Sequence, residues 1–295
     1  MTAAAESAQR DALLRAMPAV FVLIWSTGFV VARFGMPHAP PLTFLSWRYA
    51  FSVAAFAVWI RLSGAAWPRG RAAWAHLAVT GVLMHAGYLG GVWAAVKGGL
   101  GAGTAALVVG LQPVLTAMWL SAGTQHRVSP RQWLGLALGL GGLVLVVWHK
   151  LGVGEVTALN FSLAVLALLS ITAGTLYQKR FVQPCDVRTA NTVQLAAAFA
   201  VSAPLALLEP GGMDWHPHLI GAMAWSVLAL TLGGSSLLYL LIQRGAATRV
   251  TSLMYLVPPC TAVLAWWLFG EALGMRVLLG VAVTAVGVSL VVRER

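Results

Sequence analysis

The sequence is poor in charge and in cysteine. Charged residues make up 9% of its 295 positions, against roughly 25% in a typical soluble domain, while 59% are hydrophobic. This composition excludes a soluble globular protein and predicts an integral membrane protein. Only two cysteines are present, Cys185 in an expected loop and Cys260 inside an expected span. Their predicted depths differ too much for a disulfide, so both are interpreted as structural.

Acidic residues are scarcer than basic ones, and none is expected deep inside the membrane. The eight are Glu6, Asp11, Glu155, Asp186, Glu209, Asp214, Glu271 and Glu294. Proton-coupled exporters of cationic drugs typically need a buried carboxylate that exchanges a proton for the substrate, so this class is disfavoured. Carriers of phosphorylated sugars need a buried cation. None is expected at the midplane, because Arg48 is predicted to snorkel to the outer surface as a structural residue.

Long apolar stretches, in contrast, fill the chain. Ten reach membrane-spanning length, at residues 17–36, 42–62, 74–96, 103–123, 131–149, 159–181, 189–208, 219–243, 248–269 and 275–292. The second five repeat the pattern of the first five at an offset of 145 to 146 positions, so that Gly28 matches Gly174 and Pro113 matches Pro258. Because five is odd, the second copy must be inverted in the membrane.

The predicted fold class is therefore an all-α integral membrane protein with ten transmembrane helices in two inverted five-helix repeats. The repeats occupy residues 17–149 and 159–292. A connecting loop at 150–158 joins them, and short segments at 1–16 and 293–295 flank them. The polar first 16 residues ahead of a long first span predict an uncleaved anchor.

The net charge of +11 is interpreted as a topology signal, and nucleic-acid binding is not implied. With the N-terminus inside, only four of the 19 Lys and Arg residues fall outside, namely Arg33, Lys97, Lys150 and Arg276, while Arg48 lies in a span. The remaining 14 fall inside, as the positive-inside rule describes. Both termini are thus predicted to be cytoplasmic, with some attraction of the basic residues to anionic lipid.

Several short motifs resemble those of one membrane family. They are Trp25-Ser26-Thr27-Gly28-Phe29 ending in Arg33, Arg48, Leu111-Gln112-Pro113, Arg244-Gly245-Ala246-Ala247, Tyr255-Leu256-Val257-Pro258 and Phe269-Gly270-Glu271. On these motifs the chain resembles EamA-type transporters of the drug/metabolite transporter superfamily, and within them the bacterial aromatic amino acid exporters of YddG type. The resemblance implies ten helices in two inverted halves and a bacterial inner-membrane location. The chain departs from the family pattern where Glu271 aligns with His126, so this acid is not repeated in the first half.

Substrate sites of inverted-repeat transporters lie near the bilayer centre, where polar and aromatic side chains are the informative ones. The residues selected for substrate binding are Trp25, Thr27, His85, Tyr88, Gln112, Thr175, Ser235, Tyr239 and Tyr255. A central ionisable group such as His85 is costly unless it faces a cavity or a partner, and its alternative role is a neutral imidazole that bonds a neighbouring helix. The alternative for Trp25 is core packing.

Proline and glycine positions predict how the helices bend and pack. Pro113 and Pro258 each remove a helical hydrogen bond and occupy equivalent places in the two halves, so both are predicted hinges, with neutral tolerance as the alternative. Gly135 and Gly139 form a small-xxx-small pair that is expected to allow close helix packing, with dimer contact as a further use.

Two other groups are given structural or weak interpretations. Trp93 and Trp119 lie deep in their spans and are interpreted as facing lipid. Asp214, His216 and His218 have residue types that bind metals but are too few, so neither a metal nor a cofactor is expected.

These features favour a carrier of zwitterions with apolar side chains, which agrees with the amino acid exporter resemblance. The predicted function is export of neutral amino acids, aromatic and otherwise apolar, by alternating access. Uniport is favoured because no acid is expected deep in a span, which leaves His85 as the only central group that could carry a proton near neutral pH. The alternatives are an exporter of other small metabolites or drugs, with or without proton coupling, a passive channel or scaffold, and a membrane-embedded enzyme. The enzyme is disfavoured because the sequence contains neither a Gly-x-Ser-x-Gly nor a His-Glu-x-x-His motif. The expected partners are the amino acid substrate and membrane lipid, in a monomer or homodimer.

Overall fold

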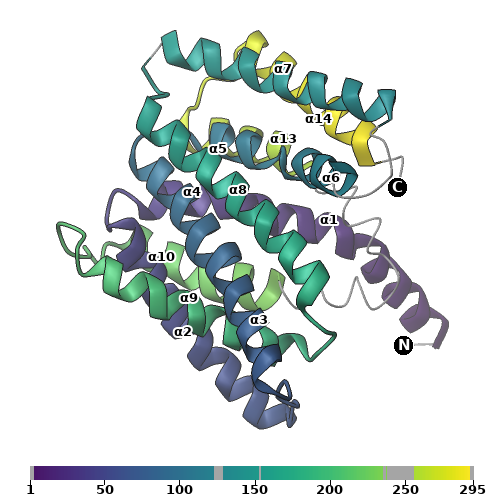
Figure 1. The fold of residues 1–295 in the computed structure, drawn as a ribbon, viewed down its shortest axis with the longest axis vertical. Coiled ribbons are helices and arrows are strands. Elements are labelled where there is room, and N and C mark those ends of the chain that lie inside the picture. The colour runs from purple at the N-terminus through teal and green to yellow at the C-terminus, as the bar shows by residue number, and fades with distance from the viewer. Residues whose placement is uncertain (1–2, 123–128, 153, 235–236, 238–255, 293–295) are drawn as a thin grey trace.

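The computed structural model describes residues 3–122, 129–152, 154–234, 237 and 256–292, and within these ranges it is helical with no strand (Figure 1). The first half contains α1 (Ala3–Gly35), α2 (Pro41–Ser63), α3 (Arg71–Gly81), η1 (Val82–Gly87), α4 (Tyr88–Lys97), α5 (Ala102–Val109), α6 (Gln112–Ala122) and α7 (Pro130–Gly152). The second half contains α8 (Ala158–Phe181), α9 (Val187–Ala206), α10 (Pro217–Trp225), η2 (Ser226–Gly234), α13 (Val257–Phe269) and α14 (Met275–Val292).

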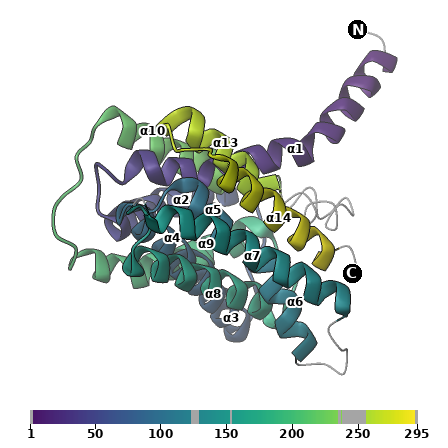
Figure 2. The same cartoon turned by 90° about the horizontal axis from the view of Figure 1, so that it is seen from above.

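Four helical segments are long and apolar enough to cross a membrane: Pro41–Ser63, Arg71–Lys97, Ala158–Phe181 and Pro217–Gly234. Five shorter apolar helices accompany them. The predicted fold class, an all-α membrane protein of two inverted five-helix repeats, is confirmed. The N-terminal end of α1 projects from the helix bundle (Figure 2).

The contact between α7 and α14 displays the inverted symmetry directly, since these are the last helices of the two halves and lie side by side (Figure 1). The Thr284 hydroxyl lies 3.3 Å from the Gly139 carbonyl oxygen, to which it donates, and the two positions are related by the repeat offset of 145. A Cβ on Gly142 would collide with the backbone of Gly280, and a Cβ on Gly287 would collide with the backbone of Gly135. The expectation that Gly135 and Gly139 allow close helix packing is confirmed, and the packing partner is α14 of the same chain.

The expected span at 103–123 is helical through residue 122, but a turn at residues 110–111 separates it into α5 and α6. The Gly110 amide still bonds the Ala106 carbonyl at 2.8 Å, but the Leu111 amide bonds Val108 at 3.2 Å in a tighter turn. Pro113 then occupies the second residue of α6 and Pro258 the second residue of α13, positions where a missing N–H leaves no helical bond unmade. Both prolines therefore occupy the first turn of a helix.

Two wide helical turns lie at equivalent places in the halves. The offset of 146 carries Val82–Gly87 of η1 onto residues 228–233, which fall within η2. Such π-type turns are rare and are found disproportionately at functional sites. The repeat thus preserves an unusual backbone feature that hydropathy alone does not reveal.

Several acidic side chains accept hydrogen bonds at helix N-termini or form ion pairs. Glu209 accepts hydrogen bonds from the amides of Leu42 and Thr43 at 2.9 and 2.8 Å, at the start of α2. Glu271 accepts from the Ala102 amide at 2.8 Å, at the start of α5. The Lys150 Nζ lies 2.6 Å from Glu155 and 3.7 Å from Glu271. Negative charge at a helix N-terminus is stabilising. Glu209 and Glu271, which belong to the second half, therefore stabilise the starts of two helices of the first half.

Candidate functional site

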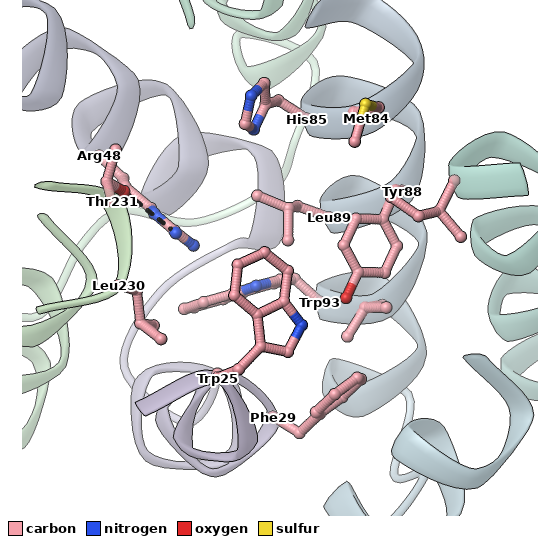
Figure 3. Close-up of a pocket in the computed structure, with 13 residues that line it drawn as sticks. Trp25, Phe29, Arg48, Met84, His85, Tyr88, Leu89, Trp93, Leu230 and Thr231 are labelled. Atoms are coloured by element: carbon pink, nitrogen blue, oxygen red, sulfur yellow. Dashed lines mark hydrogen bonds between the residues drawn. The ribbon is translucent and has the colours of Figure 1, made fainter. Parts of the chain in front are cut away.

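A cavity of about 110 Å³ lies between α1, α2, the α3–η1–α4 segment, α8 and η2 (Figure 3). Both halves contribute to it. Its walls are formed by Trp25, Gly28, Phe29, Arg48, Met84, His85, Tyr88, Leu89, Val92, Trp93, Ile171, Leu230 and Thr231. The lining is mostly apolar and aromatic with a few polar groups, which is the usual character of a small-molecule site.

The aromatic part of the wall comes from α1 and α4. Trp25 and Phe29 lie one helical turn apart on α1, and Tyr88 and Trp93 project from α4 (Figure 3). Trp93 is only 1% exposed and stacks on Phe44 with ring centroids 4.4 Å apart. The expectation that Trp93 faces lipid is therefore wrong, whereas Trp119 is 71% exposed on the outside of the helix bundle.

Arg48 is the charged group of the cavity. The expectation that it snorkels to the outer surface is wrong, since its side chain is buried at 7% exposure and points from α2 into the cavity (Figure 3). Its Nη2 donates to the Thr231 hydroxyl at 3.2 Å, and Thr231 in turn donates to the Ser226 carbonyl at 2.8 Å. The Arg48 Nε is buried without a hydrogen-bond partner. A buried cation is therefore available to an anionic substrate, contrary to the expectation from the sequence.

The repeat relates Arg48 to a second polar contact at the same depth. An offset of 146 carries Arg48 onto Gln194 and His85 onto Thr231. The contact of Arg48 with Thr231 thus has its counterpart in Gln194, whose side chain lies beside His85. The His85 backbone carbonyl also accepts a 2.9 Å hydrogen bond from the Tyr49 hydroxyl. One half contributes a cation to this paired arrangement and the other half a neutral amide.

The structure brings only some of the predicted site residues together. Trp25, His85 and Tyr88 line the cavity. The Gln112 amide donates to Thr175 at 2.9 Å, but this pair lies between α6 and α8 and does not line the cavity. Thr27 accepts a 2.8 Å hydrogen bond from the Trp225 indole on an exposed face. Ser235, Tyr239 and Tyr255 lie outside the described residues.

Phe29, Leu89 and Val92 line the cavity but were not predicted, and they share two helix faces with residues that were. His85, Tyr88, Leu89 and Val92 recur at spacings of three and four, which places them on one face of the α3–η1–α4 segment, and Trp25, Gly28 and Phe29 do the same on α1. This spacing was available as a signal for Phe29, Leu89 and Val92. Arg48 had a different signal. The repeat offset pairs it with the polar Gln194, just as it pairs His85 with the polar Thr231, so both halves place polar residues at these two positions.

Three histidines converge at one end of the molecule. The potential ligand atoms of His38, His216 and His218 lie within 4.8 Å of one another, and the His38 Nδ1 lies 3.2 Å from Asp214. The His38 and His216 rings stack with centroids 4.3 Å apart, and the His216 Nδ1 accepts from the His218 amide at 3.2 Å. His38 was not included in the sequence assessment of this loop. The prediction that the loop binds no metal stays a prediction.

Two inverted five-helix halves that share a central cavity define an inverted-repeat membrane transporter. Comparison with known families agrees, since the model of the EamA-like transporter family matches residues 16–148 and 159–293. The chain therefore belongs to the EamA-like transporter family, as the motifs predicted, and it is a multi-pass membrane protein.

Individual relatives cover almost the whole chain. A "Probable amino-acid metabolite efflux pump" of Salmonella typhimurium is 26% identical over 275 residues, covering 90% of each chain. An "Uncharacterized inner membrane transporter YedA" of Escherichia coli K12 is 27% identical over 284 residues, covering 95% of this chain and 91% of the relative. A solved crystal structure superimposes with a TM-score of 0.66 at 16% identity, covering 95% of this chain and 97% of the other, which shows a shared fold.

Proposed function

We propose that the protein exports neutral amino acids, chiefly those with aromatic or other apolar side chains, across the bacterial inner membrane by alternating access. The observation that carries the proposal is the central cavity, which combines the aromatic surfaces of Trp25, Tyr88 and Trp93 with the buried cation of Arg48. Aromatic walls complement an apolar side chain, and a guanidinium complements a carboxylate. The relative named as an amino-acid metabolite efflux pump supports the same substrate class.

The size of the cavity also favours a small solute. At about 110 Å³ it is smaller than the roughly 300–1,000 Å³ of pockets that hold drug-sized ligands. The cation in its wall opposes cationic drugs, and a single guanidinium is one charge short of matching a phosphate ester. This cavity therefore suits a small anionic or zwitterionic solute better than a cationic drug.

The proposed transport cycle uses features that the two halves share. Pro113 and Pro258 lie at the starts of α6 and α13, and these two positions are the proposed hinges of alternating access. Uniport is proposed because none of the described carboxylates lines the cavity to couple a proton. Both termini are proposed to be cytoplasmic, and the working unit a monomer or homodimer.

Counterflow in proteoliposomes tests the proposal. Labelled phenylalanine outside should exchange with unlabelled phenylalanine inside, with saturation, and methionine and threonine should compete. Glutamate and methyl viologen should compete weakly, because their side-chain or net charge does not match the apolar wall and the single cation. A pH gradient that alone drives concentrative uptake, and still does so in a His85→Ala variant, would overturn the uniport.

A further inference from the structure

The charge of Arg48 has no counter-ion among the described residues. Every acid whose side chain the structure describes is engaged elsewhere: Glu155 and Glu271 with Lys150, Asp186 with Arg188, Glu209 with the start of α2, and Asp214 with His38. Glu6 and Asp11 precede Trp25 on α1 by at least 14 residues, which is about 21 Å along a helix. Glu294 lies outside the described residues.

A buried and unpaired guanidinium is unfavourable by itself. Its desolvation is compensated only when a partner supplies opposite charge and hydrogen-bond acceptors. Thr231 supplies one neutral acceptor at 3.2 Å, and the Nε has none. The planar fork of an arginine side chain matches the two oxygens of a carboxylate, which accept its N–H groups in parallel. The group that fits the unmet donors of Arg48 is therefore a carboxylate carried in by the solute.

The other described walls of the cavity offer the solute no second charge. Trp25, Leu89 and Tyr88 lie across the cavity from Arg48, and Leu230 lies on the same side as Arg48 (Figure 3). Aromatic faces attract an ammonium group only weakly at partly hydrated sites, and the field of Arg48 opposes any cation. A carboxylate thus gains a charge partner in this cavity, whereas an α-ammonium group does not.

We propose that the Arg48 guanidinium binds the carboxylate of the transported solute, so that the carrier selects small apolar monocarboxylates and does not require the α-ammonium group. This inference rests on the proposed function and narrows its substrate class. Neutral amino acids are then zwitterionic members of a wider set that includes their α-hydroxy acid analogues.

Three compounds that share a phenyl ring separate the two charged groups. Phenylalanine carries both the carboxylate and the ammonium, 3-phenyllactate carries only the carboxylate, and phenethylamine carries only the ammonium. In counterflow with labelled phenylalanine, phenyllactate should compete about as well as phenylalanine, and phenethylamine should not compete. Arg48→Gln should raise the KM on the order of 10- to 100-fold, the range expected when a charge-assisted hydrogen bond is lost. Arg61→Gln is the matched control, because Arg61 is exposed on the same helix.

Thermal unfolding distinguishes binding from a structural role. Replacing an unpaired buried charge with an apolar side chain should stabilise the protein, so Arg48→Met should unfold at a higher temperature than the wild type while losing the competition by phenyllactate. In the wild type, phenyllactate should raise the unfolding temperature, and in Arg48→Met it should not. This ligand shift is measured in detergent and does not depend on transport.

Each outcome decides one of the two proposals. Saturable phenylalanine counterflow that phenethylamine inhibits as well as phenyllactate does, or that keeps its KM in Arg48→Gln, overturns the carboxylate inference and leaves the exporter standing. Absence of counterflow with every amino acid overturns the proposed function, and the ligand shift by phenyllactate then decides the role of Arg48 alone. A lower unfolding temperature for Arg48→Met, with the phenyllactate shift unchanged, marks Arg48 as structural and overturns the inference.

Discussion

The contact between α7 and α14 predicts opposite behaviour for two adjacent glycines. A Cβ on Gly142 would lie 2.8 Å from the backbone nitrogen of Thr284, whereas a Cβ on Gly141 meets nothing within 4 Å. Real Cβ contacts of this kind are about 3.4 Å or longer, so Gly142→Ala must separate the helices by roughly 0.6 Å or more at this point. Inserting a methyl group into a close-packed contact costs about 1–3 kcal/mol.

The two alanine substitutions share every other effect, which makes their difference informative. Both replace glycine in the interior of α7, where alanine is favoured by about 0.8–1 kcal/mol in helix propensity. Gly141→Ala should therefore leave stability unchanged or raise it slightly. Gly142→Ala should be less stable than Gly141→Ala by about 1–3 kcal/mol, read as a lower unfolding midpoint in the same detergent.

Symmetry adds a third variant to this experiment. Gly287 follows Gly142 by the repeat offset, and a Cβ there would collide with the backbone of Gly135 and Gly139. Gly287→Ala should thus lower the midpoint by an amount similar to Gly142→Ala. Equal midpoints for Gly141→Ala and Gly142→Ala would refute the close helix contact, and with it the packing account of the two halves.

Three further predictions concern a helix terminus, a loop carboxylate and the cavity wall. Glu209→Gln should lower the unfolding midpoint by an amount corresponding to about 1 kcal/mol, since it removes negative charge from the start of α2, whereas Asp214→Asn at a 73% exposed side chain should change it less. Hydrogen bonds from Arg188 hold the pKa of Asp186 below its usual value, so its stabilising effect is present at neutral pH and is lost as the pH falls through that lowered pKa. Asp186→Asn should accordingly be slightly less stable than the wild type at pH 7, with the difference vanishing in unfolding scans at strongly acid pH. Trp25→Ala should raise the KM for phenylalanine more than the KM for threonine in counterflow, because the indole ring of Trp25 would contact the phenyl ring of the substrate. An equal change in both KM values would contradict the place of Trp25 in the apolar wall.

The sequence was sufficient for the fold because its signals are redundant along the chain. Ten apolar stretches and a repeat with an odd number of helices predict the inverted architecture, and no single residue decides it. The glycines of α7 were also predictable in kind, since small residues at a spacing of four pack helices closely. Their partner was not, because the same pattern serves contacts within a chain and between chains.

Arg48 shows why the site was harder to predict. Its depth was judged from its distance along the span to the nearer end, and that distance is compatible with snorkelling. Helical phase decides the outcome instead, because Arg48 lies on the face of α2 that meets η2. Hydropathy carries no phase for a helix that is apolar on all sides. The same limit explains Trp93, which is deep in its span yet faces the cavity.

The break between α5 and α6 had a local signal that span assignment ignores. Gly110 and Pro113 stand three residues apart in the middle of an apolar stretch, and both weaken a continuous helix. Hydropathy windows average over such positions and report one span. The wide turns η1 and η2 left no comparable trace, because they are made of apolar and small residues with only His85, Ser226 and Thr231 as polar members.

Counterflow of labelled phenylalanine into proteoliposomes preloaded with unlabelled phenylalanine tests the central claim most directly. A carrier with the proposed cavity should show saturable exchange that neutral amino acids inhibit strongly and methyl viologen only weakly. Protein that is well folded by its unfolding transition yet shows no exchange, or shows only a flux linear in concentration, would contradict amino acid transport by alternating access.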